Sequence, residues 1–140
     1  MKNNENDKEN LVSDLYSRQV GLYGLETMKK IMKLNILIYG MRGLGIEIAK
    51  NIILSGPNRV TIFDPNIAKI NDLTANFYLT KDDIENQKRR YEAVLNKLSL
   101  LNSYVKVNIM KGENILENIN HSLENEKSKY DVGVISLQTK

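Results

Sequence analysis

The chain of 140 residues contains no cysteine and a single histidine, His121. The absence of cysteine excludes a disulfide framework, a cysteine-ligated zinc site and a thiol nucleophile within these residues. His121 lies in a polar stretch, with no carboxylate or hydroxyl at a spacing typical of a catalytic triad, and we interpret it as a solvated surface residue. The sequence therefore offers no candidate for cysteine chemistry or for general base catalysis.

Long apolar runs and blocks of one charge are also missing. No segment approaches the roughly 20 apolar residues that span a membrane, and residues 1–10 lack the apolar core of a secretory signal. The 20 Lys and Arg and the 17 Asp and Glu are spread along the chain, with no basic block interleaved with aromatic residues. These patterns predict a soluble intracellular protein with no membrane or nucleic-acid partner and with a disordered tail over residues 1–12.

The length and the hydrophobic fraction of 41% allow one hydrophobic core but not two, so residues 13–140 are expected to form one domain or part of a larger enzyme. Apolar periodicity predicts strands over residues 35–39, 59–63, 105–109 and 130–135, and helices over 25–32, 44–55, 80–101 and, weakly, 115–123. This order predicts an α/β, Rossmann-like three-layer fold with a mostly parallel sheet. No helix follows the fourth strand, which suggests that the domain is truncated there.

Helical spacing gives three further expectations. The predicted apolar stripe of the helix after the first strand consists of Leu44, Ile48 and Ile52, with Ala49 and Ile53 beside it. The longest helix is expected to begin at Thr80 as its N-cap and to run unbroken to about Leu101. Its charged residues, Arg90 among them, are interpreted as a solvated face with spaced ion pairs.

Residues 36–45 combine a buried strand, a glycine-rich turn and the start of a helix, the layout that cradles nucleotide phosphates. The fingerprint of such loops places a second glycine two positions after Gly40, so that bare backbone approaches the phosphates, but Arg42 stands there. Gly43 and Gly45 complete a loop that we predict to be degenerate and not to bind nucleotide. The alternative is that Arg42 itself pairs with a phosphate.

Asp64 follows the second strand, 24 residues after Gly40, near the acidic position of the same fingerprint. Its carboxylate can accept a hydrogen bond from a ribose, or it can cap the turn before Pro65 through an Asx-type hydrogen bond. Both interpretations stay open. Asp64 and the glycine loop are the only support for a nicotinamide-dependent dehydrogenase domain, and Arg42 counts against it.

Several segments together resemble the N-terminal half-domain of the ubiquitin-activating enzymes. They are residues 15–19, 40–54, 72–73, 76–79 and 101–105. The resemblance implies the fold of the bacterial adenylyltransferases of the molybdopterin and thiamine pathways. It also implies two such domains paired about a pseudo-two-fold axis, of which one adenylates the C-terminal glycine of ubiquitin with Mg-ATP.

The sequence is similar to the silent member of that pair, because it departs from the active half at four motifs. Arg42 replaces a glycine, Thr74 and Ala75 replace an asparagine and an arginine, Asn86 replaces a lysine, and residues 136–139 lack an aspartate. The resemblance then implies that ATP and Mg bind in the partner half. No cofactor and no metal are expected on this chain.

Arg18 is the one contribution to catalysis that the resemblance implies. It is expected to cross the interface and to pair with the ATP phosphates of the active half, since a guanidinium keeps its charge and grips two phosphate oxygens. The transfer of ubiquitin to a cysteine and to conjugating enzymes is expected in other domains. The chain is thus predicted to be an inactive fragment of an ATP-dependent ubiquitin-activating enzyme of the cytoplasm and nucleus, with the active half and ubiquitin as partners.

Two alternatives stand beside this prediction and that of a dehydrogenase. Within the same class, the chain resembles the separate silent subunit of a SUMO- or NEDD8-activating enzyme. In a different class, it is a dimerisation module without catalytic function, for which the Arg18→Ala substitution leaves a partner's catalysis intact.

Overall fold

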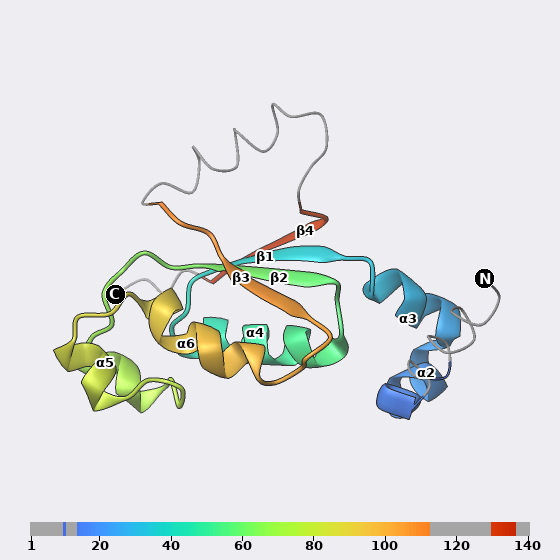
Figure 1. Ribbon diagram of the computed structural model, residues 1–140, viewed down its shortest axis with the longest axis horizontal. Coiled ribbons are helices and arrows are strands. Elements are labelled where there is room, and N and C mark those ends of the chain that lie inside the picture. Colours follow the sequence, from blue (N-terminus) through green and yellow to red (C-terminus); the bar gives the residue numbers. More distant parts are fainter. Residues whose placement is uncertain (1–9, 11–13, 113–129, 137–140) are drawn as a thin grey trace. The chain divides into compact units, whose positions relative to one another are not determined.

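The computed structural model describes residues 10, 14–112 and 130–136 (Figure 1). These residues belong to two compact units, residues 1–33 and residues 34–140. The tail predicted over residues 1–12, the weak helix over 115–123 and His121 lie outside the described residues, apart from Asn10.

The first unit is a pair of short helices, α2 (Ser17–Tyr23) and α3 (Leu25–Ile31), joined at Gly24. Gly24 adopts a φ of 82°, which a glycine reaches without the steric cost of a side chain, and its N–H donates to the carbonyl of Val20. The small core consists of the buried Tyr16 and Met28 with Val20, Leu25, Ile31 and Met32 packed against them. The apolar face predicted for the second helix is therefore confirmed, whereas α2 had not been predicted.

The second unit is built on a four-stranded parallel sheet with the order β3-β2-β1-β4 (Figure 1). The strands are β1 (Asn35–Tyr39), β2 (Arg59–Phe63), β3 (Lys106–Ile109) and β4 (Val132–Ile135). The α/β class and the parallel sheet are confirmed, and the first two strands have the predicted limits. The chain moves outward from β1 to β3 and then returns to place β4 on the other side of β1, which makes the β1/β4 boundary a topological switch point.

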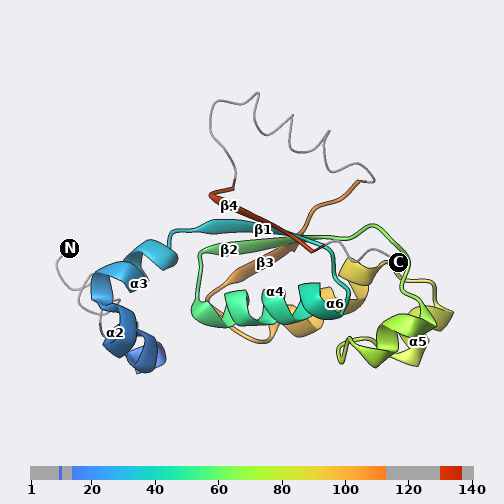
Figure 2. The ribbon, with the colours of Figure 1, turned by 180° about the vertical axis from the view of Figure 1, so that it is seen from behind.

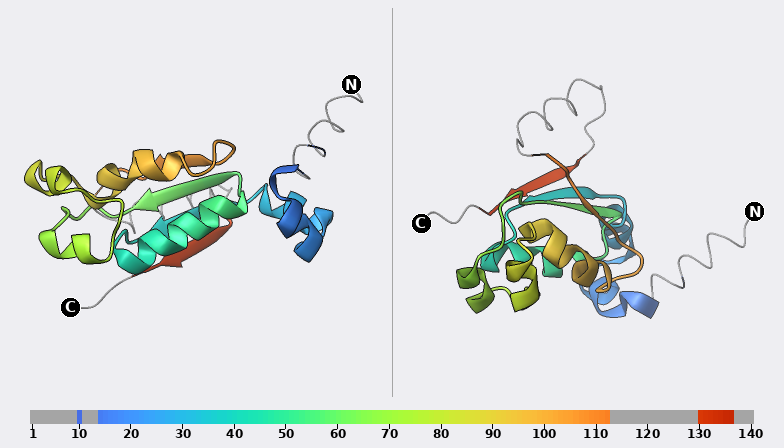
Figure 3. Two further views of the ribbon diagram at one scale, coloured as in Figure 1. Left: turned by 90° about the horizontal axis from the view of Figure 1, so that it is seen from below. Right: turned by 60° about the vertical axis from the view of Figure 1, so that its left-hand side comes forward.

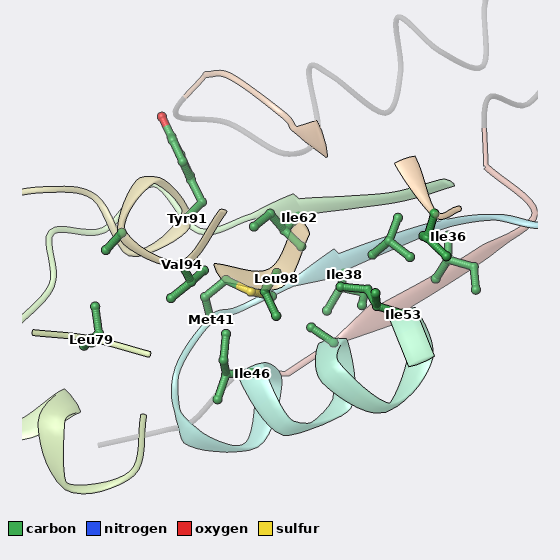
Figure 4. Packing of buried hydrophobic residues seen from close by; sticks show 14 of the residues in the cluster. Ile36, Ile38, Met41, Ile46, Ile53, Ile62, Leu79, Tyr91, Val94 and Leu98 are labelled. Atoms are coloured by element: carbon green, nitrogen blue, oxygen red, sulfur yellow. The ribbon is translucent and has the colours of Figure 1, made fainter. Parts of the chain in front are cut away.

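Two helices, α4 (Gly43–Ser55) and α6 (Arg90–Ser99), cover one face of this sheet (Figures 1 and 2). Seen from below they run along that face, with β4 at the edge of the sheet (Figure 3). The main core fills the space between sheet and helices (Figure 4). Its labelled members are Ile36, Ile38, Met41, Ile46, Ile53, Ile62, Leu79, Tyr91, Val94 and Leu98.

The buried face of α4 differs from the predicted stripe. Leu44 is 56% exposed, and the residues buried on this helix are Gly45, Ile46, Ala49 and Ile53. The rotation of the helix is set at its first turn, because a Cβ at Gly45 would lie 1.7 Å from the carbonyl oxygen of Gly40. The helix therefore buries the face that contains Gly45, Ala49 and Ile53. The prediction that Leu44 lies on the buried face was wrong.

The predicted long helix is two helices in the structure, α5 (Lys81–Glu85) and α6, and a short 3-10 helix, η1 (Ile70–Thr74), precedes them. The N-cap at Thr80 is confirmed, because the Thr80 hydroxyl accepts a hydrogen bond from the backbone N–H of Asp83. The prediction of one unbroken helix to about Leu101 was wrong.

Tertiary hydrogen bonds explain the break between α5 and α6. The Ala68 N–H donates to the Lys88 carbonyl at 3.0 Å, and the Arg90 N–H donates to the Asn66 carbonyl at 2.9 Å. Gln87 turns the chain with a φ of 50°, a conformation that residues other than glycine adopt infrequently. The contacts with residues 66–68 therefore replace the local bonds that a continuous helix would have made.

Asp83 provides a test of the α5 cap. Its carboxylate accepts from the backbone and hydroxyl of Thr80 at 3.0 and 2.7 Å and from the Lys88 ammonium at 2.7 Å. Burial acts to raise the pKa of Asp83, but the hydrogen bonds from Lys88 and Thr80 outweigh it and hold the pKa below its ordinary value. The stabilisation is therefore full well above the ordinary pKa and is lost as the pH falls through the interval between the two values.

We expect Asp83→Ala to lower the free energy of unfolding by about 1–2 kcal/mol at neutral pH. Urea denaturation at about pH 7 and about pH 3 measures this, and the difference from the unsubstituted chain should shrink at the acidic pH. Asp82→Ala, at the exposed neighbouring position, is the matched control and should change stability by less than about 0.5 kcal/mol. Equal effects of the two substitutions would contradict the assignment.

Candidate functional site

A pocket of about 840 Å³ opens at the carboxyl ends of β1, β2 and β4, which is the topological switch point of the sheet. We call it the crevice. The residues at the strand ends meet there with residues from the start of α4, from the loop after β2 and from the start of α6. Those used below are Gly40, Arg42, Asp64, Lys69, Arg89, Arg90, Glu92 and Ser136.

The three glycines of the loop are each required by close packing. Gly40 has a φ of 98°, and a Cβ there would lie 2.1 Å from the carbonyl oxygen of Ser136. A Cβ at Gly43 would lie 2.6 Å from the Cβ of Ala75, and one at Gly45 would meet the Gly40 carbonyl. Packing alone therefore accounts for this glycine pattern, without a ligand.

The Asp64 carboxylate is used inside the protein. Its Oδ2 accepts from the Met41 N–H at 2.8 Å, and its Oδ1 accepts from the backbone N–H and the side-chain amide of Asn66 at 3.2 and 2.9 Å. The bond from the Asn66 N–H is the Asx-type hydrogen bond of one of the two interpretations given above. Asp64 is 2% exposed, so the geometry favours that interpretation over contact with a ribose.

Arg42 is the N-cap residue of α4, with extended backbone at a φ of −83°. Its side chain is 36% exposed, and its Nε lies 3.5 Å from Oδ1 of Asp72. The guanidinium therefore lies at the crevice wall beside a buried carboxylate. Whether it excludes a nucleotide or pairs with a phosphate stays a prediction.

Arg90 was wrongly predicted to lie on a solvated helix face. It is 7% exposed, and its guanidinium contacts two buried carboxylates. Its Nε donates to Asp72 Oδ2 at 2.8 Å, its Nη2 to Asp72 Oδ1 at 3.4 Å and its Nη1 to Asp64 Oδ2 at 3.5 Å. A sequence signal existed, because Arg90, Val94 and Leu98 share one helix face and the other two are apolar.

Asp72 and Asn76 were also missed as members of the site. The Asp72 carboxylate contacts the guanidinium groups of Arg90 and Arg42. It also accepts a hydrogen bond from the Lys69 N–H at 2.9 Å. The Asn76 amide donates to the Met41 carbonyl at 3.3 Å, and its oxygen accepts from the Tyr78 N–H at 3.0 Å. The hydrogen bond between Asn76 and Met41 therefore links the segment that follows η1 to the glycine loop.

Among the candidate residues, the structure brings Gly40, Arg42, Gly43, Gly45 and Asp64 together around the crevice. Arg18 belongs to the first unit, where it is an exposed residue of α2. Its role in a neighbouring active site stays a prediction.

Two features are absent from residues 10, 14–112 and 130–136, a cluster of metal ligands and a helix that could span a membrane. No group of three His, Cys, Asp or Glu side chains there is placed to hold a metal ion. No helix within those ranges is both long and apolar enough to cross a membrane.

The parallel sheet, the glycine-rich turn after its first strand and the crevice at the switch point define an α/β domain of the nucleotide-binding class. The family model that matches residues 16–135 is that of the ThiF family. The chain belongs to the ThiF family.

The curated relatives that match include proteins named ubiquitin-activating enzyme and ubiquitin-like modifier-activating enzyme. Ubiquitin-activating enzyme E1 2 of Arabidopsis thaliana is 45% identical over 111 residues, which are 79% of this chain and 10% of the relative. Ubiquitin-like modifier-activating enzyme 1 of Homo sapiens is 47% identical over 98 residues, which are 70% of this chain and 9% of the relative. The chain thus spans about a tenth of the length of these relatives.

Solved structures share the fold at low sequence identity. The E. coli tRNA N6-threonylcarbamoyladenosine dehydratase TcdA in complex with AMP has a TM-score of 0.75 and 13% identity, over 91% of this chain and 50% of that one. E. coli MccB has a TM-score of 0.71 and 22% identity, over 89% of this chain and 37% of that one. These similarities confirm the Rossmann-like architecture.

Removal of the Arg90 guanidinium tests the buried charge cluster. Arg90→Met leaves the carboxylates of Asp72 and Asp64 buried without their cation, and we expect a loss of about 3–5 kcal/mol in the free energy of unfolding. Urea denaturation measures it. Lys81→Met, at an exposed position on α5, is the matched control. A loss below about 1 kcal/mol for Arg90→Met would show that the cluster is solvated.

A second test addresses the close contact at Gly45. Gly45→Ala places a methyl group against the Gly40 carbonyl, and we expect a loss of about 3 kcal/mol or more in the free energy of unfolding. Gly133→Ala is the matched control, because a Cβ there meets no atom of the described residues within 4 Å. Similar midpoints of thermal or urea unfolding for the two variants would refute the proposed packing.

Proposed function

We propose that this chain is the catalytically silent adenylation half of a ubiquitin-activating enzyme and that it pairs with an active half holding ATP and Mg. Its family and its relatives, which are named ubiquitin-activating or ubiquitin-like modifier-activating enzymes, support the class. The observation that supports the silent role is the hydrogen bonding of Asp64. Both of its carboxylate oxygens accept hydrogen bonds from the protein itself, one from Met41 and the other from Asn66.

Two features that a nucleotide would need in the crevice are engaged or replaced. A ribose needs a free acceptor after the second strand, and Asp64 is 2% exposed. A pyrophosphate needs bare backbone at the second glycine position, and Arg42 stands there. We infer that the chain by itself does not adenylate ubiquitin.

Arg18 is the residue that we assign to the reaction in the partner half. It is exposed, and a guanidinium keeps its charge at any working pH and forms paired hydrogen bonds with phosphate oxygens. In the proposed role it neutralises the negative charge that develops on the ATP phosphates as pyrophosphate leaves. Ubiquitin, conjugating enzymes acting through other domains, and location in the cytoplasm and nucleus belong to the same proposal.

The test is ubiquitin-dependent exchange between ATP and pyrophosphate in the full-length enzyme that contains this chain. Arg18→Ala should lower the exchange rate by about 10²-fold or more, the scale of a donor that stabilises transition-state charge. Arg18→Lys should recover part of the rate, because it keeps the charge but loses the fork of donors.

Lys30→Ala provides the matched control, since Lys30 is another exposed cation of the same unit. It should leave the exchange rate unchanged. An Arg18→Ala rate equal to that of the control would remove Arg18 from the mechanism and favour a dimerisation module. A second adenylation domain in the same reading frame would favour the ubiquitin-activating enzyme over a separate subunit of a SUMO- or NEDD8-activating enzyme.

The dehydrogenase alternative rested on the glycine loop and Asp64. Membership of the ThiF family explains the presence of the glycine loop without a dehydrogenase. The internal hydrogen bonds of Asp64 remove the second argument.

A further inference from the structure

The crevice keeps an excess of positive charge although its nucleotide features are engaged or replaced. Its wall carries the cations Arg42, Lys69, Arg89 and Arg90 against the carboxylates of Asp64 and Glu92. Asp72, behind the wall, pairs with Arg90 at 2.8 Å and lies 3.5 Å from Arg42. Arg42 remains 36% exposed and Lys69 is exposed, so these two cations are accessible from the pocket side.

Ser136 supplies a second and independent observation. It directly follows β4, lines the crevice and is 7% exposed. Its Oγ is buried and has no hydrogen-bond partner among the residues that the structure describes. A buried hydroxyl without a partner costs folding free energy, and in native proteins such a group commonly has a ligand or a water to bond.

The N-terminus of α4 adds hydrogen-bond donors of the right kind. This helix of 13 residues begins at Gly43, directly after Arg42, and the Arg42 side chain makes no hydrogen bond that caps its first turn. The first N–H groups of a helix point outward and favour an anion. Guanidinium, ammonium, hydroxyl and backbone N–H are together the donors that phosphate oxygens accept.

We propose that the crevice binds a small phosphate-bearing anion that has no nucleoside, either free phosphate or a phosphate monoester. The phosphate group contacts Arg42 and Lys69, accepts from the start of α4 and receives the Ser136 hydroxyl as a further donor. The nucleoside is excluded because Asp64 has no free acceptor for a ribose. This inference does not depend on the role proposed for Arg18.

The experiment titrates the 140-residue chain, labelled with ¹⁵N, at constant ionic strength held with sodium chloride. The probes are inorganic phosphate, glycerol 3-phosphate, AMP and adenosine. We expect phosphate and glycerol 3-phosphate to shift the amide signals of residues 40–45 and 136 with a Kd on the order of 1 mM. AMP should bind no more tightly than glycerol 3-phosphate, and adenosine should not bind.

Variants assign the binding to this site. Arg42→Ala and Ser136→Ala should each weaken phosphate binding, the first by about tenfold, because it removes a charge-assisted donor. Lys106→Ala is the control, because Lys106 is exposed and lies at the opposite end of the sheet, next to Arg59 in the register of β3 and β2. This substitution should leave the Kd unchanged. Unfolded variants are recognised by the loss of the dispersed spectrum, and Arg42→Lys then replaces Arg42→Ala.

The outcomes separate this proposal from the proposed function. No saturable shift with either phosphate probe, or equal weakening by Lys106→Ala, overturns the anion site and leaves the silent role intact. AMP binding at least about tenfold tighter than glycerol 3-phosphate would show that the nucleoside is recognised, which overturns both the nucleoside exclusion and the silent crevice. A preference for glycerol 3-phosphate over free phosphate would identify a phosphate monoester as the ligand class.

Discussion

The second unit depends on a cluster of buried charges at the carboxyl end of its sheet. Asp64 fixes the glycine loop through the Met41 N–H, and Arg90 joins Asp64 to Asp72. Buried carboxylates are tolerated in a protein interior only when cations and N–H donors satisfy them. The cluster therefore couples the loop after β1, the loop after β2, η1 and the first turn of α6. The two loops and the first turn of α6 contribute residues to the wall of the crevice.

The same cluster engages Asp64, the acidic residue that follows the second strand, in hydrogen bonds within the protein. In a nucleotide-binding domain of this class, the acidic residue after the second strand contacts the ribose. In this chain the equivalent carboxylate holds the loop in place without a ligand. The glycines are retained because Gly45 packs directly on the Gly40 carbonyl and Gly40 on the end of β4. These contacts require the glycines whether or not a nucleotide binds.

The candidate functional groups of this chain are charged side chains, since it contains no cysteine. The two candidate arginines are Arg18, on an exposed helix of the first unit, and Arg42, at the second unit's crevice. A guanidinium suits both positions because it stays charged and recognises phosphate oxygens in pairs. The chain belongs to the ThiF family and is similar to a ubiquitin-activating enzyme over about a tenth of that enzyme's length.

The sequence by itself determined the parallel α/β class, the limits of β1 and β2, and the cap at Thr80. These follow from local information, since central parallel strands are continuous apolar runs and a capping residue acts within one helical turn. Only the tertiary structure decided the rotation of α4, the break at Gln87 and the burial of Arg90. The break at Gln87 and the burial of Arg90 depend on groups distant in sequence, namely residues 66–68 and the Asp72 carboxylate. The rotation of α4 depends on the folded loop that brings the Gly40 carbonyl against Gly45. Periodicity records which residues share a helix face, but it does not record which buried charge or backbone atom that face will meet.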